Sequence, residues 1–166
     1  VIGFGGRTIE KDVLPKYINS PESPVFSKRT ALFGIEKTKK AITEMNEAFI
    51  VEGYFDLIAL YQHGFRNVIA TLGTAITENH LSRLRNYTEN ITLMLDGDEA
   101  GAKSALRLIG IFPDMDIQGN MVVLPSGHDP DSFVRKEGME GIQKVIADKK
   151  SILDYFFDYA KNKYGV

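Results

Sequence analysis

Cysteine is absent from this chain of 166 residues. Its absence excludes disulfides, thiolate metal sites and thiol nucleophiles, and it fits a cytoplasmic protein. No apolar run approaches the roughly 18–20 residues that a membrane helix needs. No segment resembles a signal peptide, so we expect no membrane partner.

An excess of basic residues is also missing. Lysine and arginine number 20 against 22 acidic residues, which gives a net charge of −2. Any contact with nucleic acid therefore has to come from a local basic patch. The hydrophobic content of 43% is that of an ordinary globular protein with one core. Because the chain starts with Val1 inside a predicted strand, we expect it to be a piece of a longer protein.

From residue 47 onward, short apolar strands alternate with amphipathic helices. The predicted strands are 48–51, 67–70, 91–95 and 120–124. The predicted helices are 55–63, 78–86, 99–111 and 131–149, the last interrupted near Gly138–Gly141. This alternation predicts right-handed βαβ units. We therefore expect an α/β fold with a four-stranded parallel sheet flanked by helices on both faces.

The first 30 residues are rich in glycine and proline, which favours an irregular segment. Within it we predict a strand at Val1–Phe4, a loop or hairpin through Glu10–Val13 and extended chain near Tyr17–Ile18. A helix is predicted over Ala31–Asn46, and a C-terminal helix with an aromatic stripe over Ser151–Tyr164. The predicted division is a basic N-terminal segment with its linking helix (1–46), an α/β domain (47–150) and the C-terminal helix (151–166).

Two aspartates stand one residue apart at the end of the predicted strand 91–95. Side chains two residues apart in an extended chain point to the same side, so Asp96 and Asp98 face one spot. Gly97 between them lets the backbone turn and approach a ligand closely. Two carboxylates at one spot repel unless a cation lies between them. A DGD sequence on its own is equally compatible with a polar turn that closes a strand.

Acidic residues follow two other predicted strands. Glu52 comes directly after strand 48–51, with Asp56 one helical turn on, and Asp129 and Asp131 follow strand 120–124. Small polar residues, Thr71 to Thr74, follow the fourth strand. In an open parallel sheet, ligands bind outside the carboxyl ends of the strands. Three of four strands therefore deliver carboxylates to one edge of the sheet.

The chemistry of such a cluster is restricted. Two carboxylates about 4 Å apart repel by about 4 kcal/mol at an effective dielectric of about 20. Oxygen ligands, with no cysteine and three histidines, favour Mg²⁺ or Mn²⁺ over zinc. This pattern indicates phosphoryl or nucleotidyl transfer by metal-assisted displacement. A glycosidase acid pair is the competing interpretation, but this edge is too charged for it. His128 beside the acids could be a ligand, a proton donor or a loop residue, and we favour the last.

Basic residues are spread along the irregular N-terminal segment. Arg7, Lys16, Lys28 and Arg29 lie there, with Tyr17 among them. Basic side chains on an adaptable loop suit contacts with phosphate. The alternative is a solvated loop that carries lysines.

Four stretches carry a resemblance to the TOPRIM domain, a module of nucleotidyl transfer and hydrolysis shared by topoisomerases, primases and some nucleases. They are EGYFD at Glu52–Asp56, ATLGT at Ala70–Thr74, DGDEAG at Asp96–Gly101, and LPSGHDPDSFVRKEG at Leu124–Gly138. Further stretches resemble the bacterial replicative primases of the DnaG type. They are VIGFGGR at Val1–Arg7, PKYINSPESPVF at Pro15–Phe26, ALFG at Ala31–Gly34 and VEGYFD at Val51–Asp56. The resemblance covers nearly the whole chain, and it implies a TOPRIM fold within an RNA polymerase core fragment.

The resemblance also implies roles for particular residues. Glu52, Asp96 and Asp98 would be catalytic and bind metal, with Asp56, Asp129 and Asp131 supporting a further ion or its waters. The groove for template and nucleotide would be lined by Arg7, Lys16, Tyr17, Asn19, Ser20 and Lys28. The implied cofactor is Mg²⁺, with Mn²⁺ able to substitute.

The implied activity is template-directed synthesis of RNA primers from NTPs on single-stranded DNA by a two-metal nucleotidyl transfer. The implied partners are the DNA template, NTPs, the RNA–DNA hybrid product and a replicative helicase, the last through a domain outside this chain. The implied location is the bacterial cytoplasm, with the nucleoid, at the replication fork. A TOPRIM nuclease, a topoisomerase-type domain and a non-enzymatic assembly module are the alternatives.

Overall fold

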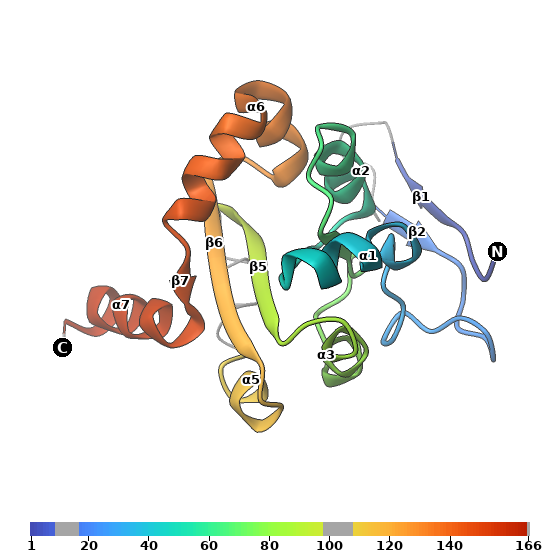
Figure 1. Cartoon of the computed structure of the whole chain (residues 1–166), viewed down its shortest axis with the longest axis horizontal. Helices are drawn as coiled ribbons and strands as arrows, with labels where there is room; N and C mark the ends of the chain where they lie inside the picture. Colours follow the sequence, from blue (N-terminus) through green and yellow to red (C-terminus); the bar gives the residue numbers. More distant parts are fainter. Residues whose placement is uncertain (9–16, 98–107, 166) are drawn as a thin grey trace.

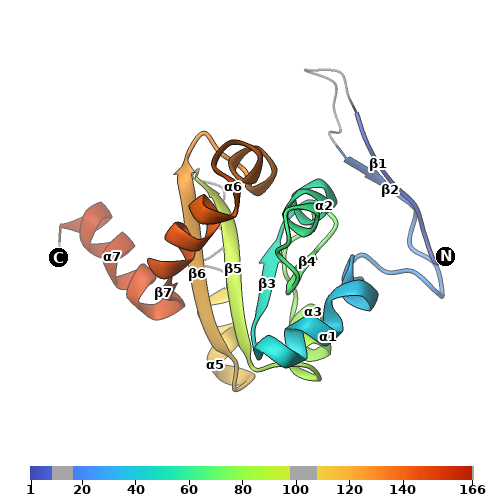
Figure 2. The ribbon, with the colours of Figure 1, turned by 45° about the horizontal axis from the view of Figure 1, so that its top comes forward.

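The computed structural model describes residues 1–8, 17–97 and 108–165 (Figure 1). Their central feature is a sheet of five strands in the order β4-β3-β5-β6-β7. Its strands are β3 (Ala48–Val51), β4 (Val68–Ala70), β5 (Asn90–Gly97), β6 (Gln118–Ser126) and β7 (Lys150–Ser151). The first four run parallel, which confirms the predicted parallel sheet. Figure 2 shows β6, β5, β3 and β4 side by side.

The fifth strand was not predicted. β7 has two residues and pairs antiparallel with β6, Asn120 opposite Ser151 and Met121 opposite Lys150. So short a strand leaves no period-2 pattern in the sequence, and its pairing depends on where helices α6 and α7 end and begin.

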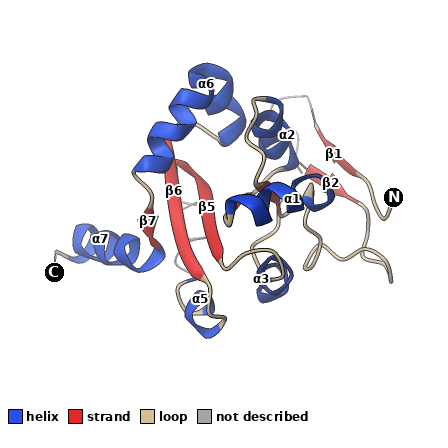
Figure 3. Cartoon of the chain, in the orientation of Figure 1, coloured by secondary structure: helices blue, strands red, loops and turns tan. Residues whose placement is uncertain are grey.

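The helices are α1 (Ile35–Met45), α2 (Tyr54–Gln62), α3 (Glu78–Arg85), α5 (Ile111–Asp114), α6 (Pro130–Ala147) and α7 (Ile152–Tyr164) (Figure 3). The helix predicted over 99–111 lies largely outside the described residues. The predicted interruption of the 131–149 helix is present, because Gly138 has φ 65° and ψ −169°, which no helix accommodates. No helix within the described ranges is long and apolar enough to cross a membrane.

Two apolar clusters lie on opposite faces of the sheet. In β3, Ala48 and Ile50 belong to one cluster while Phe49 and Val51 belong to the other. The first cluster takes in side chains of α1 and α3, and the second takes in those of α2 and α6. Because successive side chains of a strand point to opposite faces, a strand buried on both sides is a continuous apolar run. The result is the three-layer arrangement expected from the sequence.

The N-terminal segment forms a separate two-stranded hairpin of β1 (Gly5–Arg7) and β2 (Tyr17–Asn19). The strand predicted at Val1–Phe4 is wrong. Val1, Ile2 and Phe4 are exposed, and the strand begins where Gly5 pairs with Asn19. The extended chain predicted near Tyr17–Ile18 is present as β2. The turn predicted through Glu10–Val13 lies outside the described residues.

The helix predicted from Ala31 begins four residues later. Phe33 makes an isolated antiparallel bridge to Ala70, with N–H to O distances of 2.9 and 3.1 Å in the two directions. This bridge holds the chain extended before α1. Gly34 then has φ 88°, which ends the extended stretch and lets Ile35 start the helix.

Candidate functional site

Glu52 lies at the carboxyl end of β3, beside the end of β5. The two strands are neighbours, with Ile50 opposite Leu93, so Glu52 is level with Leu95. The main-chain carbonyl of Glu52 accepts a hydrogen bond of 2.9 Å from the N–H of Gly73. A small pocket at this end is lined by residues that include Glu52, Thr71 and Leu95. The structure thus places Glu52 within one strand spacing of the segment that carries Asp96.

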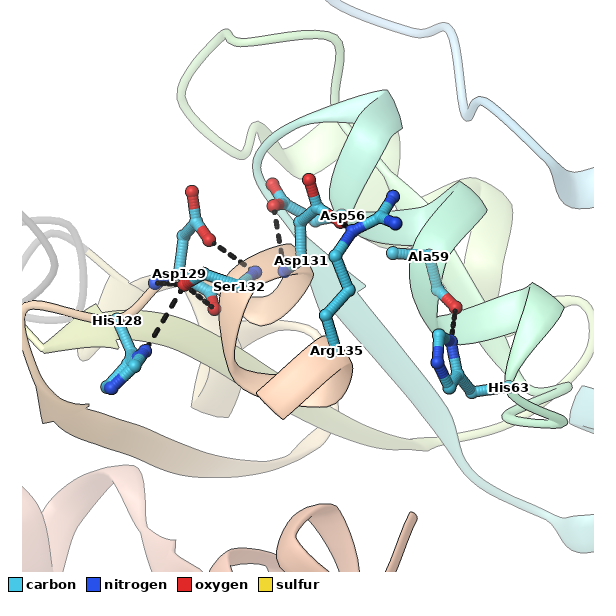
Figure 4. A network of polar contacts seen from close by, with 8 residues as sticks. All are labelled: Asp56, Ala59, His63, His128, Asp129, Asp131, Ser132 and Arg135. Atoms are coloured by element: carbon cyan, nitrogen blue, oxygen red, sulfur yellow. Dashed lines mark hydrogen bonds and ion pairs between the residues drawn. The ribbon is translucent and has the colours of Figure 1, made fainter. Parts of the chain in front are cut away.

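Asp56 lies in the first turn of α2 and is buried, with 7% of its surface exposed. Its carboxylate accepts hydrogen bonds from two main-chain N–H groups, that of Gly53 at 3.0 Å and that of Asp131 at 3.4 Å. Burial, together with the charges of Asp129 and Asp96, raises the pKa of Asp56 from 3.8 to about 7. Three carboxylates from three elements therefore lie close enough to affect one another. Figure 4 shows Asp56 and Asp129 in this network.

Asp129 and Asp131 lie at the start of α6. Asp129 is the N-cap, and its carboxylate accepts a hydrogen bond of 2.8 Å from the N–H of Ser132. Asp131 is 18% exposed and forms an ion pair with Arg135, one turn along the helix (Figure 4). The structure therefore places Asp129 near Asp56 and Asp96, whereas Asp131 has a cationic partner.

The segments that carry these acids are joined through Gly97. Its N–H donates to the carbonyl of His128 at 3.3 Å. A Cβ atom at Gly97 would lie 2.5 Å from the carbonyl oxygen of Pro125 and closer still to that of Leu124. Glycine is thus required because the backbone of β6 passes so near. The His128 ring packs edge-on against Phe133, with its Nδ1 3.3 Å from Ser132 Oγ, which suits a loop residue.

The oxygen donors at this end suit a hard divalent cation. Asp56 resists ionisation because it is buried and because other carboxylates lie near it, and a cation would favour its charged form. Among the described residues, no three acidic or histidine side chains are already arranged to hold an ion. Asp98, one of the predicted ligands, lies outside the described residues.

The β1–β2 hairpin lies against α2 and the turn that follows β4. The Tyr54 hydroxyl donates to the carbonyl of Gly6 at 2.5 Å, and Asn19 Nδ2 donates to the carbonyl of Leu72 at 3.0 Å. A groove there is lined by Tyr17, Ile18, Asn19, Lys28, Leu72, Gly73 and Thr74. Asn19 Oδ1 is buried, with no hydrogen-bond partner among the described atoms.

The other predicted basic-segment residues have different surroundings. Ser20 Oγ accepts from the N–H of Phe4 at 2.9 Å and so stabilises the hairpin. The Arg7 guanidinium lies over the Tyr17 ring, 5.4 Å from its centroid. The carbonyl of Lys28 accepts from His80 Nε2 at 2.9 Å, which fixes the segment to α3. Lys16 lies outside the described residues.

Three residues near this site were not predicted from the sequence. Arg135 pairs with Asp131, Phe55 contacts Arg7, and His80 holds the Lys28 segment. The spacing of Asp131 and Arg135, four residues on a helix, was a usable signal for the first. The other two contacts join segments far apart in the chain and have no local signal.

Comparisons with known proteins agree with this arrangement. Residues 49–134 match a family described as Toprim-like, and residues 1–39 match the N-terminal domain of the DNA primase catalytic core. A DNA primase of Aquifex aeolicus is 42% identical over 161 residues, 97% of this chain and 32% of the relative. The chain thus spans about a third of that relative's length.

Solved structures of DNA primase domains are also similar to this chain. A DNA primase domain from Pseudomonas aeruginosa is 41% identical with a TM-score of 0.89, over 98% of this chain and 52% of that one. A DnaG primase catalytic domain bound to single-stranded DNA is 37% identical with a TM-score of 0.86, over 98% of this chain and 52% of that one. The described fold is therefore shared with about half of each of these catalytic domains.

Proposed function

Because this chain belongs to the Toprim-like family, in the form found in DnaG-type DNA primase catalytic cores, we propose that it carries the metal-binding part of a primase. The reaction is the synthesis of RNA primers from NTPs on a single-stranded DNA template. The observation that carries this proposal is the proximity of Asp96 and Asp129 to the buried Asp56 carboxyl, whose pKa is raised by its burial and by their charges.

The acids provide the binding site for the cation. Glu52 and Asp96 at the ends of β3 and β5, with Asp98, would hold Mg²⁺, and Asp56 and Asp129 would hold a second ion or its waters. The chemistry that such a pair of ions would supply is a lower pKa for the attacking 3′-hydroxyl and charge neutralisation for the departing pyrophosphate. Mn²⁺ has the same preference for oxygen ligands and would substitute. Asp131 would contribute less to binding the cation, because Arg135 already neutralises its charge.

The hairpin provides the phosphate-binding side of the site. Arg7 lies in the hairpin and Lys28 on the segment that follows it, and Lys16 belongs to the same N-terminal segment of the sequence. They would bind the template backbone and the NTP phosphates, which makes affinity fall with rising salt. Tyr17, Asn19 and Ser20 shape the groove beside them. A structural relative bound to single-stranded DNA supports the template as partner.

The whole enzyme would act at the replication fork in the cytoplasm, with an RNA–DNA hybrid as its product. A replicative helicase would bind through a part of the protein outside this chain. The division into a basic segment (1–46), a Toprim domain (47–150) and a C-terminal helix (151–166) remains our proposal for how the chain is organised.

The test is primer synthesis by the longer protein that contains this chain. Asp96→Asn is expected to lower the formation of oligoribonucleotides from NTPs by at least about 100-fold, because a charge that binds the cation is lost. Template binding, measured by fluorescence anisotropy, should stay within about threefold, since Asp96 is not among the phosphate-binding residues.

The matched control is Asp116→Asn, which removes an exposed carboxylate whose partner is Arg85. It should leave synthesis unchanged. Full synthesis by Asp96→Asn would refute the proposal. Cleavage of the template without any synthesis by the unaltered protein would instead favour a Toprim nuclease.

A further inference from the structure

The guanidinium of Arg7 lies over two aromatic rings that come from different parts of the chain. It is 5.4 Å from the centroid of Tyr17 and 5.3 Å from that of Phe55. Tyr17 is the partner of Arg7 across the β1–β2 hairpin, whereas Phe55 lies in the first turn of α2, three residues after Glu52. The pair of contacts therefore joins the basic hairpin to the acidic end of the sheet.

The charges of Arg7, Asp56 and Asp129 all act on Tyr17, so the guanidinium lies in the neighbourhood of carboxylates. An arginine so placed is normally drawn into an ion pair. Arg7 forms no salt bridge within the part of the chain that the structure describes. Cation–π contact uses the flat face of the guanidinium and leaves its five N–H donors in the plane. The two rings thus hold the charge near the site without consuming its hydrogen-bonding capacity.

Contacts other than those of Phe55 also hold the hairpin in place, although the Tyr54 ring that makes them packs 5.5 Å from the Phe55 ring. The Tyr54 hydroxyl bonds to the carbonyl of Gly6, and the Tyr17 and Tyr54 rings meet edge to face at 5.1 Å. Phe55 itself is 37% exposed and belongs to none of the apolar clusters of the core. Removing its ring should therefore take away one of the two ring contacts of the guanidinium while the hairpin stays docked.

We propose that Phe55 is a positioning residue: with Tyr17 it holds the Arg7 guanidinium beside the acidic end of the sheet, where its N–H groups bind phosphate. The inference rests on the proposed function only for the source of that phosphate, an NTP or the DNA template. Phe55 does not itself touch the ligand. Its effect on binding passes entirely through Arg7.

The first experiment observes the contact itself. Protons above an aromatic ring are shifted upfield, so the Arg7 Nε–H resonance of the 166-residue chain should lie upfield of the ordinary arginine range. Phe55→Leu keeps an apolar side chain but removes the ring, and it should move this resonance toward the ordinary position. Phe55→Tyr restores a ring and should restore the shift. A resonance unaffected by Phe55→Leu would overturn the proposal.

The second experiment is a double-mutant cycle on binding. Its probes are a fluorescent single-stranded oligothymidylate and, separately, ATP with Mg²⁺. Phe55→Leu should weaken binding by about 2- to 5-fold, the value of an exposed cation–π contact, and Phe55→Tyr should bind like the unaltered chain. In an Arg7→Ala background, Phe55→Leu should have no further effect.

The results with the two probes show whether Arg7 binds the phosphate of the template or that of the nucleotide. Loss of affinity for oligothymidylate alone assigns the phosphate to the template, and loss for ATP alone assigns it to the nucleotide. An equal loss in both backgrounds would overturn the proposal, because Phe55 would then contact the ligand directly. Binding that does not depend on Arg7, or no binding at all, would also overturn it. Primer synthesis plays no part in these readouts, so failure of the proposed function would be seen separately.

Discussion

The carboxylates at the two ends of the sheet have different surroundings. At the amino end, Glu47 accepts a hydrogen bond of 2.6 Å from Lys149 Nζ and another of 2.6 Å from the Thr92 hydroxyl. At the carboxyl end, the Asp56 carboxylate accepts hydrogen bonds from the main-chain N–H groups of Gly53 and Asp131 and lies near the charges of Asp129 and Asp96. The first arrangement stabilises the fold, whereas the second lowers stability unless a cation is supplied.

This contrast gives the largest expected effect, on the pH dependence of stability. The pKa of Asp56 is raised from 3.8 to about 7, so its contribution is fully present below about pH 4 and is lost as pH rises through about 7. Without divalent cations, the free energy of unfolding should fall by about 4 kcal/mol over that range on account of Asp56.

Urea unfolding at several pH values, followed by circular dichroism, measures this slope. Asp56→Asn should flatten it, because the amide does not titrate. Asp116→Asn, at an exposed position, should keep it. An unchanged slope in Asp56→Asn would mean that the two ends do not differ in the way described.

Much of the fold was predictable because it depends on local patterns. The residues of β3 and β4 are all buried, and their continuous apolar runs mark strands covered on both faces. The position of the acids followed from the same pattern, since carboxyl ends of parallel strands share one edge. The comparisons with known primases confirm the family that these motifs resemble.

The parts of the structure that the sequence did not predict depend on contacts between distant segments. Val1–Phe4 has the apolar character of a strand yet is exposed, and the bridge from Phe33 to Ala70 delays α1. The contact of Phe55 with Arg7 likewise has no signature in either local sequence. Exposed apolar residues and long-range pairs are decided by tertiary packing, which a single sequence does not display.

The second prediction tests how the acidic end is built. Gly97→Ala should lower the free energy of unfolding by about 2–3 kcal/mol, because the new methyl group meets the main-chain carbonyls of Leu124 and Pro125. Thermal unfolding measures it. Gly110→Ala is the control, since a Cβ atom there meets nothing within 4 Å. Equal stability of the two variants would contradict the close approach of β5 to β6.

The smallest effect is expected at the amino end. Glu47→Gln removes the charge opposite Lys149 and should cost about 1 kcal/mol, because the partly exposed pair is screened by solvent. Primer synthesis by the longer protein should not change. A loss of synthesis comparable to that of Asp96→Asn would mean that the amino end also takes part in function.

The most direct measurement is the position of Mn²⁺ in crystals of this chain, located by anomalous diffraction. The account predicts manganese at the carboxyl ends of β3 and β5, bound by carboxylate oxygens from the Glu52, Asp56, Asp96 and Asp129 group. Manganese bound only elsewhere, or Glu52 turned away from an ion held by Asp96, would contradict it.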